Sequence, residues 1–362
     1  MMWIGVAMML LYLGGNTYVF IRLWQLLQPA PMWCRVTFAA LFLFAVLALF
    51  VAMVLRHASL PVWVHRVLFG VGSVWLVFLL YMVLTTALFD VAHLIFPSLK
   101  YGVLYALGAT TLLLVCGYVN YRLPRVERVV VPTTKHLEDD YRIVMVSDVH
   151  LGYGTTKRDM ERYVRLINEQ RGDVVVIVGD LIDNSVVPIA AEDMCRMFDD
   201  VVAPDGIYMV AGNHEYISGI EACEEYLAST SVRLVRDSVV TLPSGVQLIC
   251  RDDRSNRRRA TIDSLLQGVD MSRPTVVLDH QPYDVEAATR RGVDIYLAGH
   301  THRGQVWPLT WLTDAMYAQS HGHRVWGSSH VIVSMGLSLW GPPFRIGTHS
   351  EIFNIEINEE SE

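Results

Sequence analysis

The sequence predicts an all-α membrane region followed by an α/β domain. Of the 362 residues, 52% are hydrophobic, and the mean hydropathy of +0.34 is too high for a purely soluble protein. Almost every charged residue follows Asn120. After Tyr141, short apolar segments repeatedly end in polar residues, which is typical of strands that carry a site at their carboxyl ends. We therefore expect a membrane region at 1–120, a linker at 121–140 and a soluble domain at 141–362.

Four uncharged stretches of the membrane region are long enough to cross a bilayer, since a spanning helix needs about 20 apolar residues. They are Met2–Ile21, Val36–Leu55, Val67–Phe89 and Tyr101–Val119. The first is interrupted by Gly14, Gly15 and Asn16. A cleaved signal peptide is the alternative for this stretch, but no basic start precedes it and no small-residue cleavage site is evident.

The basic residues near the ends of the spans predict which side of the membrane the soluble domain occupies. With four spans, one side carries Arg56, Arg66, Arg122, Arg125 and Arg128, and the other carries Arg22, Arg35 and Lys100. This balance favours a multi-pass membrane protein with its soluble domain in the cytoplasm. Counting one span differently would reverse the orientation.

Strand and helix patterns alternate after residue 141. Lys157–Gln170 has apolar residues at helical spacing, and Val129–Val131 is a candidate edge strand within the linker. The expected buried strands are short, apolar and rich in β-branched residues: Ile143–Val146, Val174–Val178, Ile207–Val210, Thr275–Leu278 and Ile295–Ala298. This alternation predicts the α/β class.

Each of these strands ends in a cluster of residues that can bind metal. In chain order the clusters contain Asp148 and His150, then Asp180, then Asn213 and His214, then His280, then His300 and His302. Any one of them alone is more often structural, but their repetition at successive strand ends indicates a shared site. Gly179 allows the sharp turn that aims Asp180 at this site, whereas Asp183 is expected to bond backbone amides of the same turn.

The motifs D-x-H, G-D-x-x-D, G-N-H-E, a single His and G-H-x-H, in this order, resemble those of the calcineurin-like metallophosphoesterase superfamily. The resemblance covers about Tyr141–Ile357 and implies a four-layer α/β/β/α sandwich with two mixed sheets. The tail Ser338–Ile352 is similar to the membrane-associated group that includes the bacterial phosphodiesterase YkuE.

The resemblance also implies a ligand set for two divalent ions. One ion would be held by Asp148, His150, Asp180 and His302, and the other by Asp180, Asn213, His280 and His300. Asp180 would bridge the ions, and His214 would contact the scissile phosphate or protonate the leaving oxygen. Two such ions lower the pKa of a bridging water, so hydroxide would attack phosphorus directly. Mixed Asp, Asn and His ligands suit Mn, Fe or Zn better than Ca.

These features predict a membrane-embedded phosphoesterase that hydrolyses a phosphodiester or pyrophosphate bond, with membrane lipids as neighbours. Its substrate would be a lipid or lipid-linked nucleotide such as UDP-2,3-diacylglucosamine. One alternative is a phosphatase for a soluble phosphomonoester or nucleotide, anchored by the helices. The other is a phosphate sensor without catalysis, although such a module has no need of His214. Nucleic acid is not an expected partner, because the net charge is -7.

Four further residues are candidates for substrate contact. Arg303 stands where the YkuE-like group usually has glycine and would add a cation beside the metals. Arg254 lies in the basic segment Arg251–Arg259, which would hold an anionic headgroup or pyrophosphate, or else form a solvated loop. Trp307 and Trp311 would form an apolar rim that touches the bilayer or an acyl chain, or else pack as an ordinary core insertion.

Overall fold

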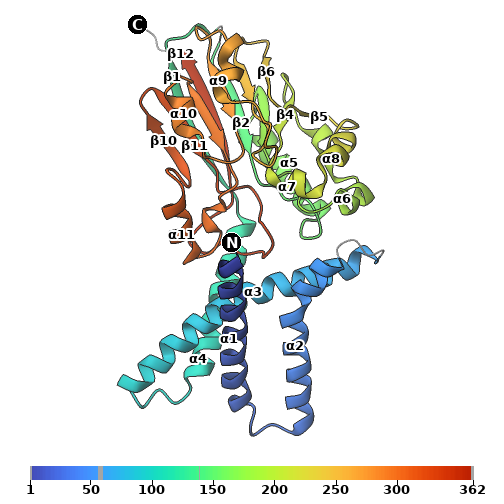
Figure 1. The fold of residues 1–362 in the computed structure, drawn as a ribbon, viewed down its shortest axis with the longest axis vertical. Helices are drawn as coiled ribbons and strands as arrows, with labels where there is room; N and C mark the ends of the chain where they lie inside the picture. The colour runs from blue at the N-terminus through green and yellow to red at the C-terminus, as the bar shows by residue number, and fades with distance from the viewer. Residues whose placement is uncertain (1, 56–59, 138, 360–362) are drawn as a thin grey trace. The chain divides into compact units, whose positions relative to one another are not determined.

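The structure, a computed structural model, describes residues 2–55, 60–137 and 139–359 (Figure 1). Arg56, which entered the charge comparison, lies outside the described residues. Internal contacts divide the chain into two units. The first takes in Met1–Val119 and Gly341–Ile346, and the second takes in Asn120–Trp340 and Gly347–Glu362.

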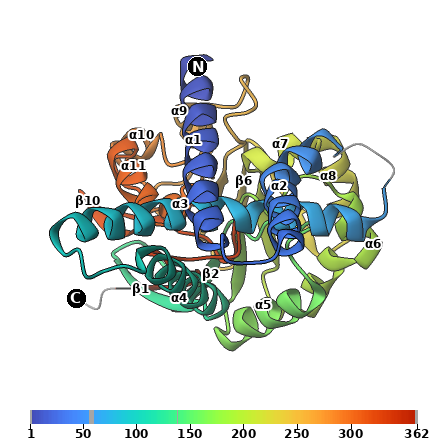
Figure 2. The ribbon, with the colours of Figure 1, turned by 90° about the horizontal axis from the view of Figure 1, so that it is seen from below.

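Helices build the first unit (Figure 2). Four of them are long and apolar enough to cross a membrane, as predicted. They are α1 (Met2–Leu26), α2 (Met32–Val54), α3 (Val62–Ile95) and α4 (Gly102–Arg122). Gly14, Gly15 and Asn16 do not interrupt α1. The Asn16 side chain donates to the Tyr12 carbonyl one turn earlier at 2.8 Å and accepts a hydrogen bond from Trp75 Nε1 of α3 at 3.0 Å, so its polar atoms are paired inside the helix bundle.

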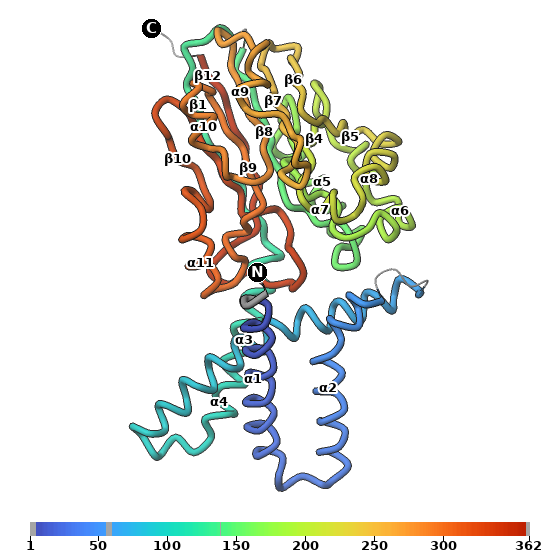
Figure 3. The backbone as a smooth tube through the Cα atoms, viewed as in Figure 1, coloured from blue at the N-terminus to red at the C-terminus, as the bar shows by residue number. Residues whose placement is uncertain are grey.

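Two six-stranded mixed sheets form the centre of the second unit (Figure 3). The first sheet has the order β1-β12-β2-β3-β4-β5 and the second the order β10-β11-β9-β8-β7-β6. The strands of the first are β1 (Arg125–Thr133), β2 (Tyr141–Val146), β3 (Val174–Val178), β4 (Ile207–Val210), β5 (Val232–Leu234) and β12 (Glu351–Glu359). Those of the second are β6 (Ser238–Thr241), β7 (Gln247–Cys250), β8 (Thr275–Leu278), β9 (Ile295–Ala298), β10 (Gly322–Trp326) and β11 (Ser329–Val333).

The five predicted strands correspond to β2, β3, β4, β8 and β9. β2, β3 and β4 run parallel in the first sheet, and β8 runs parallel to β9 in the second. Each group therefore brings its carboxyl ends to one edge of its sheet.

Residues 121–140, for which the sequence predicts a linker with a short edge strand, contain the nine-residue strand β1. It pairs in parallel with β12 from Arg125↔Glu351 to Thr133↔Glu359. Val129 and Val131 point into the core, whereas Val130 between them is exposed. This part of the chain is the edge of the first sheet rather than a free linker, because the last strand of the chain supplies its pairing partner.

Helices cover the outer face of each sheet, which gives the four-layer order implied by the resemblance. One hydrophobic cluster lies between the sheets, a second joins the first sheet to α5 (Lys157–Glu169), η1 (Met194–Asp200) and α8 (Ile220–Leu227), and a third joins the second sheet to α9 (Ile262–Leu265) and α10 (Val285–Thr289). The remaining short helices are α6 (Val187–Glu192), α7 (Asn213–Ser218), η2 (Leu266–Gly268), η3 (His302–Gly304) and α11 (Leu309–Met316). α5 begins with a capping box between Thr156 and Asp159, which fixes the start of the predicted helix.

Candidate metal centre

The predicted ligands lie in loops at the carboxyl ends of the strands, and several have an unusual backbone. Five of them have φ angles between 44° and 70°: Asp148, His150, Asp180, His300 and His302. Residues other than glycine seldom adopt this left-handed region, and each such residue costs about 1–3 kcal/mol. Main-chain bonds hold two of them in place, because the Asp148 amide donates to the Gly179 carbonyl at 3.1 Å and the His150 amide to the Asp180 carbonyl at 3.0 Å.

Two glycines let these loops approach each other closely. Gly179 precedes Asp180 with a φ of 78°, and a Cβ there would overlap the His280 ring. Gly212 precedes Asn213, and a Cβ there would overlap the Asp180 carboxylate. Both positions therefore need glycine for the site to close.

Six predicted ligands form two groups whose ligand atoms lie close together: Asp148, His150 and His302 in one, and Asp180, His280 and His300 in the other. In the first group, His302 Nε2 lies 3.3 Å from Asp148 Oδ1 and 3.0 Å from His150 Nε2. In the second, His280 Nε2 lies 3.1 Å from Asp180 Oδ2. The His280 and His300 rings meet edge to face, with centroids 5.2 Å apart.

Asp180 connects the two groups. Its Oδ2 lies 3.1 Å from His280 Nε2 and 3.8 Å from His150 Nε2. Its Oδ1 accepts a hydrogen bond of 2.8 Å from the His214 amide, which orients the carboxylate. One oxygen atom therefore faces a histidine from each group, which is the position that a carboxylate shared between two ions would occupy.

The residues present fit such ions. Two buried atoms of the predicted ligands, Asn213 Oδ1 and His300 Nδ1, have neither a hydrogen bond nor an ion pair with the described residues. An unpaired buried polar atom costs about 1–3 kcal/mol, so two of them at one site need an explanation that a bound ion would supply. Carboxylate, amide and imidazole donors together suit divalent ions such as Mn, Fe or Zn.

The protonation states of Asp180 and His300 favour metal binding, whereas His280 would have to lose a proton. Burial opposes ionisation of Asp180, but His280 and His150 outweigh it and hold the pKa of the carboxyl well below its usual range. Burial, with the charge of His280, lowers the pKa of His300 to about 4. Although His280 is fully buried, its contact with Asp180 raises its pKa, so binding of an ion would release a proton from this ring.

His214 is held in place by Asp183. Its Nδ1 donates to the Asp183 carbonyl at 2.8 Å and lies 3.0 Å from Asp183 Oδ1. Nε2 is therefore the ring nitrogen that does not contact Asp183. Burial lowers the pKa of His214, but the bond to Asp183 and the charge of Asp180 outweigh it and raise the pKa to about 9. Asp183 Oδ1 also lies 3.3 Å from His150 Nδ1. The expectation that Asp183 bonds backbone amides is therefore wrong, because its carboxylate faces two histidines.

Glu215 is a further residue of the site that the sequence analysis did not single out. It is fully buried, and its Oε2 accepts hydrogen bonds from the Asp180 amide at 3.0 Å and the Gly212 amide at 2.7 Å. Its Oε1 accepts one from the Ile182 amide at 2.9 Å. Burial, with the charge of Asp180, raises the pKa of Glu215 to about 7. The only sequence signal was its position at the end of the G-N-H-E motif.

Two of the five arginines of the basic segment Arg251–Arg259 are engaged in internal ion pairs. Arg251 Nη1 lies 2.9 Å from Asp279 Oδ2, and Arg259 Nη1 lies 3.0 Å from Asp279 Oδ1. Both guanidinium groups also pair with Asp284. These two arginines hold loops of the second sheet together, so their guanidinium groups are not available to bind a headgroup or pyrophosphate. Arg254, by contrast, is exposed.

The other candidates for substrate contact lie on or beside α11. Arg303 pairs with Asp314 at 3.2 Å, so its charge is partly offset. Trp307 and Trp311 meet edge to face at 5.3 Å, and Trp311 is 66% exposed. Leu309, Leu312 and Met316 are exposed as well. This exposure supports the apolar rim rather than an ordinary core insertion.

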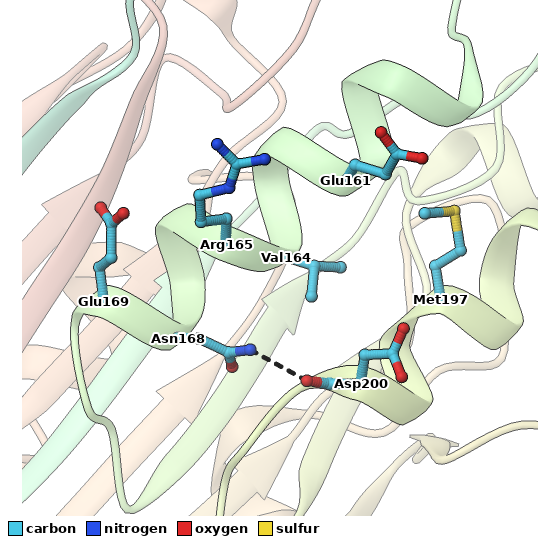
Figure 4. Close-up of a pocket in the computed structure, with 7 residues that line it drawn as sticks. All are labelled: Glu161, Val164, Arg165, Asn168, Glu169, Met197 and Asp200. Atoms are coloured by element: carbon cyan, nitrogen blue, oxygen red, sulfur yellow. Dashed lines mark hydrogen bonds between the residues drawn. The ribbon is translucent and has the colours of Figure 1, made fainter.

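A separate pocket of about 500 Å³ lies beside α5 and η1 (Figure 4). It is lined by Glu161, Val164, Arg165, Asn168, Glu169, Met197 and Asp200. The Asn168 side chain donates to the Asp200 carbonyl at 2.9 Å and bridges the helices. No predicted ligand lines this pocket, so it is distinct from the metal centre.

Residues 141–304 match the family model of calcineurin-like phosphoesterases. The chain is 30% identical over 386 residues to the transmembrane protein with metallophosphoesterase domain of Danio rerio, covering 96% of this chain and 87% of that protein. It is 30% identical over 222 residues to an uncharacterized metallophosphoesterase of Helicobacter pylori, covering 60% of this chain and 59% of the relative. It is 27% identical over 256 residues to the uncharacterized metallophosphoesterase YkuE of Bacillus subtilis, covering 65% of this chain and 87% of that protein. The chain thus spans less than two thirds of the Helicobacter relative.

Proposed function

Because the chain belongs to the calcineurin-like phosphoesterase family, we propose that it is a membrane-embedded hydrolase that cleaves phosphoesters at a centre of two divalent ions. The observation that carries this proposal is the position of Asp180 Oδ2, 3.1 Å from His280 and 3.8 Å from His150. This oxygen belongs to one group of potential ligands, with His280 and His300, and faces His150 of the other group, which also contains Asp148 and His302.

Each ion would take four ligands. Asp148, His150, Asp180 and His302 would hold the first, and Asp180, Asn213, His280 and His300 would hold the second. The unpaired Oδ1 of Asn213, which follows Gly212 at the start of α7, supports its place in the second set. Two bound ions would supply an activated water and would neutralise charge that develops on the phosphate.

The chain itself would supply the proton and the rigid frame. His214 would donate a proton from Nε2 to the leaving oxygen, since its Nδ1 is engaged by the Asp183 carbonyl. Asp183 would fix the tautomer and direction of this ring. Glu215 is a positioning residue, because it accepts hydrogen bonds from backbone amides of the two loops that carry Asp180 and Asn213.

We propose a lipid or a lipid-linked nucleotide as the substrate, cleaved at a phosphodiester or pyrophosphate bond. The exposed apolar side chains of α11 support contact with acyl chains or with the bilayer, because this helix follows the loop that carries His300 and His302. Four membrane-spanning helices in the same chain support a substrate at the membrane surface. The basic residues near the span ends support a cytoplasmic position of the hydrolase domain in a bacterial membrane.

A phosphatase for soluble phosphomonoesters or nucleotides, with the helices as an anchor, is the second candidate. It requires the same metal centre, so the centre does not separate the two. The exposed Trp311 and Leu312 favour the lipid substrate, since a soluble nucleotide gives these side chains nothing to contact. A sensor without catalysis is disfavoured by the orientation of His214, which a binding module would not need.

Hydrolysis by the purified full-length protein in detergent tests the proposal. Bis-p-nitrophenyl phosphate, a phosphomonoester and UDP-2,3-diacylglucosamine are offered side by side, with and without a chelator, and Asp180→Asn is the control variant. Metal-dependent release of UMP from the lipid supports the full proposal, and cleavage of the generic diester alone supports the chemistry without the lipid. Absence of Asp180-dependent hydrolysis of all three would overturn it.

A further inference from the structure

Three side chains from separate loops form a continuous surface beside His300. The Tyr317 ring, at the end of α11, meets the His300 ring edge to face with centroids 6.4 Å apart. Tyr283, between β8 and α10, lies 5.1 Å from Tyr317, and the two hydroxyl groups are 3.2 Å apart. The Arg254 guanidinium, in the loop after β7, lies 4.1 Å above the Tyr283 ring. The surface therefore leads from a proposed metal ligand to a cation.

Arg254 differs in its partners from Arg251, Arg259 and Arg303. Arg251 and Arg259 pair with Asp279, and Arg303 pairs with Asp314. Among the residues that the structure describes, Arg254 forms no ion pair, and the ring of Tyr283 is its neighbour. Stacking on an aromatic face fixes the plane of a guanidinium while leaving its N–H donors directed outward. Arg254 is thus a preoriented and uncompensated positive charge.

We propose that Arg254, Tyr283 and Tyr317 form a subsite for a second anionic group of the substrate, apart from the phosphate that is cleaved. This inference rests on the proposed function, because the surface begins at His300. Arg254 would bind a phosphate or carboxylate through two parallel hydrogen bonds. The two tyrosine rings would contact the part of the substrate that joins this group to the scissile phosphate.

Two chromogenic probes that differ by one phosphate test the subsite. Thymidine 5′-(p-nitrophenyl phosphate) has only the scissile diester, and its 3′-phosphorylated form adds a second anionic group. With the full-length protein in detergent, kcat/KM should be about tenfold higher for the 3′-phosphorylated probe, mainly through a lower KM, since charge-assisted hydrogen bonds have this strength. Arg254→Gln should abolish the preference, and Tyr283→Ala should reduce it.

Arg290→Gln is the matched control, because Arg290 is an exposed arginine that pairs with Glu286 on α10. It should retain the preference for the 3′-phosphorylated probe. A preference that survives in Arg254→Gln, or that is absent from the natural protein while both probes are hydrolysed, would overturn the subsite and leave the proposed function intact. Hydrolysis of neither probe would count against the proposed function itself.

A membrane surface is the other source of anionic groups, and a second arm of the experiment separates it. Both probes are measured again with phosphatidylglycerol added to the detergent micelles. If Arg254 binds lipid headgroups instead of the substrate, Arg254→Gln will change the rates only when this lipid is present and will affect both probes alike. That result would overturn the proposal.

Discussion

Glu215 fixes the backbone of Asp180, because its Oε2 accepts a hydrogen bond of 3.0 Å from the Asp180 amide. The same oxygen accepts a hydrogen bond of 2.7 Å from the Gly212 amide, so one buried carboxylate joins the loops after β3 and β4. Asp180 has a φ of 52°, a conformation that needs support from its surroundings. Glu215 therefore supplies part of the frame on which the proposed bridging ligand depends.

Replacing Glu215 should destabilise the protein and reduce its activity. Glu215→Ala removes the acceptor for three buried amides and should lower the thermal unfolding midpoint in detergent by roughly 5–10 °C. The control is Glu225→Ala, since Glu225 is exposed on α8, and its midpoint should stay unchanged. Equal midpoints for the two variants would show that Glu215 does not support these loops.

The contribution of His214 should depend on the leaving group. If His214 protonates the leaving oxygen, His214→Ala should slow hydrolysis of an alkyl phosphodiester by about 10²–10⁴-fold. The loss should be much smaller for the p-nitrophenyl ester, because p-nitrophenolate leaves without protonation. The measurement is kcat for both esters of the same nucleotide. An equal loss for both would assign His214 to phosphate contact, and no loss for either would remove it from the site.

The ion pairs of Asp279 should be essential for stability. Asp279 is fully buried between Arg251 and Arg259, so Asp279→Ala leaves buried charge poorly compensated and should cost about 3–5 kcal/mol. Unfolding is measured on chelator-treated protein, so that a loss of bound metal does not contribute. Asp263→Ala is the control, because its pair with Arg291 is exposed and should contribute about 0–1 kcal/mol. Similar losses in both variants would contradict this role.

The exposed side of α11 should matter for lipid substrates. Replacing Trp311 and Leu312 together by serine should lower the rate on a lipid substrate, relative to the rate on a soluble diester, by about tenfold or more. Val202→Ser is the control, since Val202 is a 70% exposed side chain outside α11, and it should keep the ratio. An unchanged ratio in the α11 variant would favour a soluble substrate.

Local patterns in the sequence were sufficient to predict the short buried strands and helix α5, whereas the four-layer sandwich was implied by the family resemblance. Strands such as Val174–Val178 are short and wholly apolar, and Asp180 lies two residues after the end of this strand. Helix α5 was recognisable because its apolar residues repeat at helical spacing. These signals lie within a few residues of each other, so they do not depend on distant contacts.

Features that depend on distant partners could not be predicted. The strand β1 was underestimated because it pairs with β12 near the other end of the chain. The roles of Asp183 and Glu215 depend on which loops approach them. The role of Arg251 and Arg259 depends on Asp279, which is 20 or more residues away along the chain and lies between their guanidinium groups. Choice of an ionic partner is a property of the folded chain.

The metal content of the purified full-length protein tests the central claim most directly. Protein stripped with a chelator and reloaded with Mn is passed through a desalting column, and bound metal is counted by mass spectrometry alongside hydrolysis of bis-p-nitrophenyl phosphate. We predict two ions per chain for the natural protein, and fewer ions with loss of hydrolysis for Asp180→Asn. Full metal content with undiminished hydrolysis in Asp180→Asn would contradict a centre organised around this carboxylate.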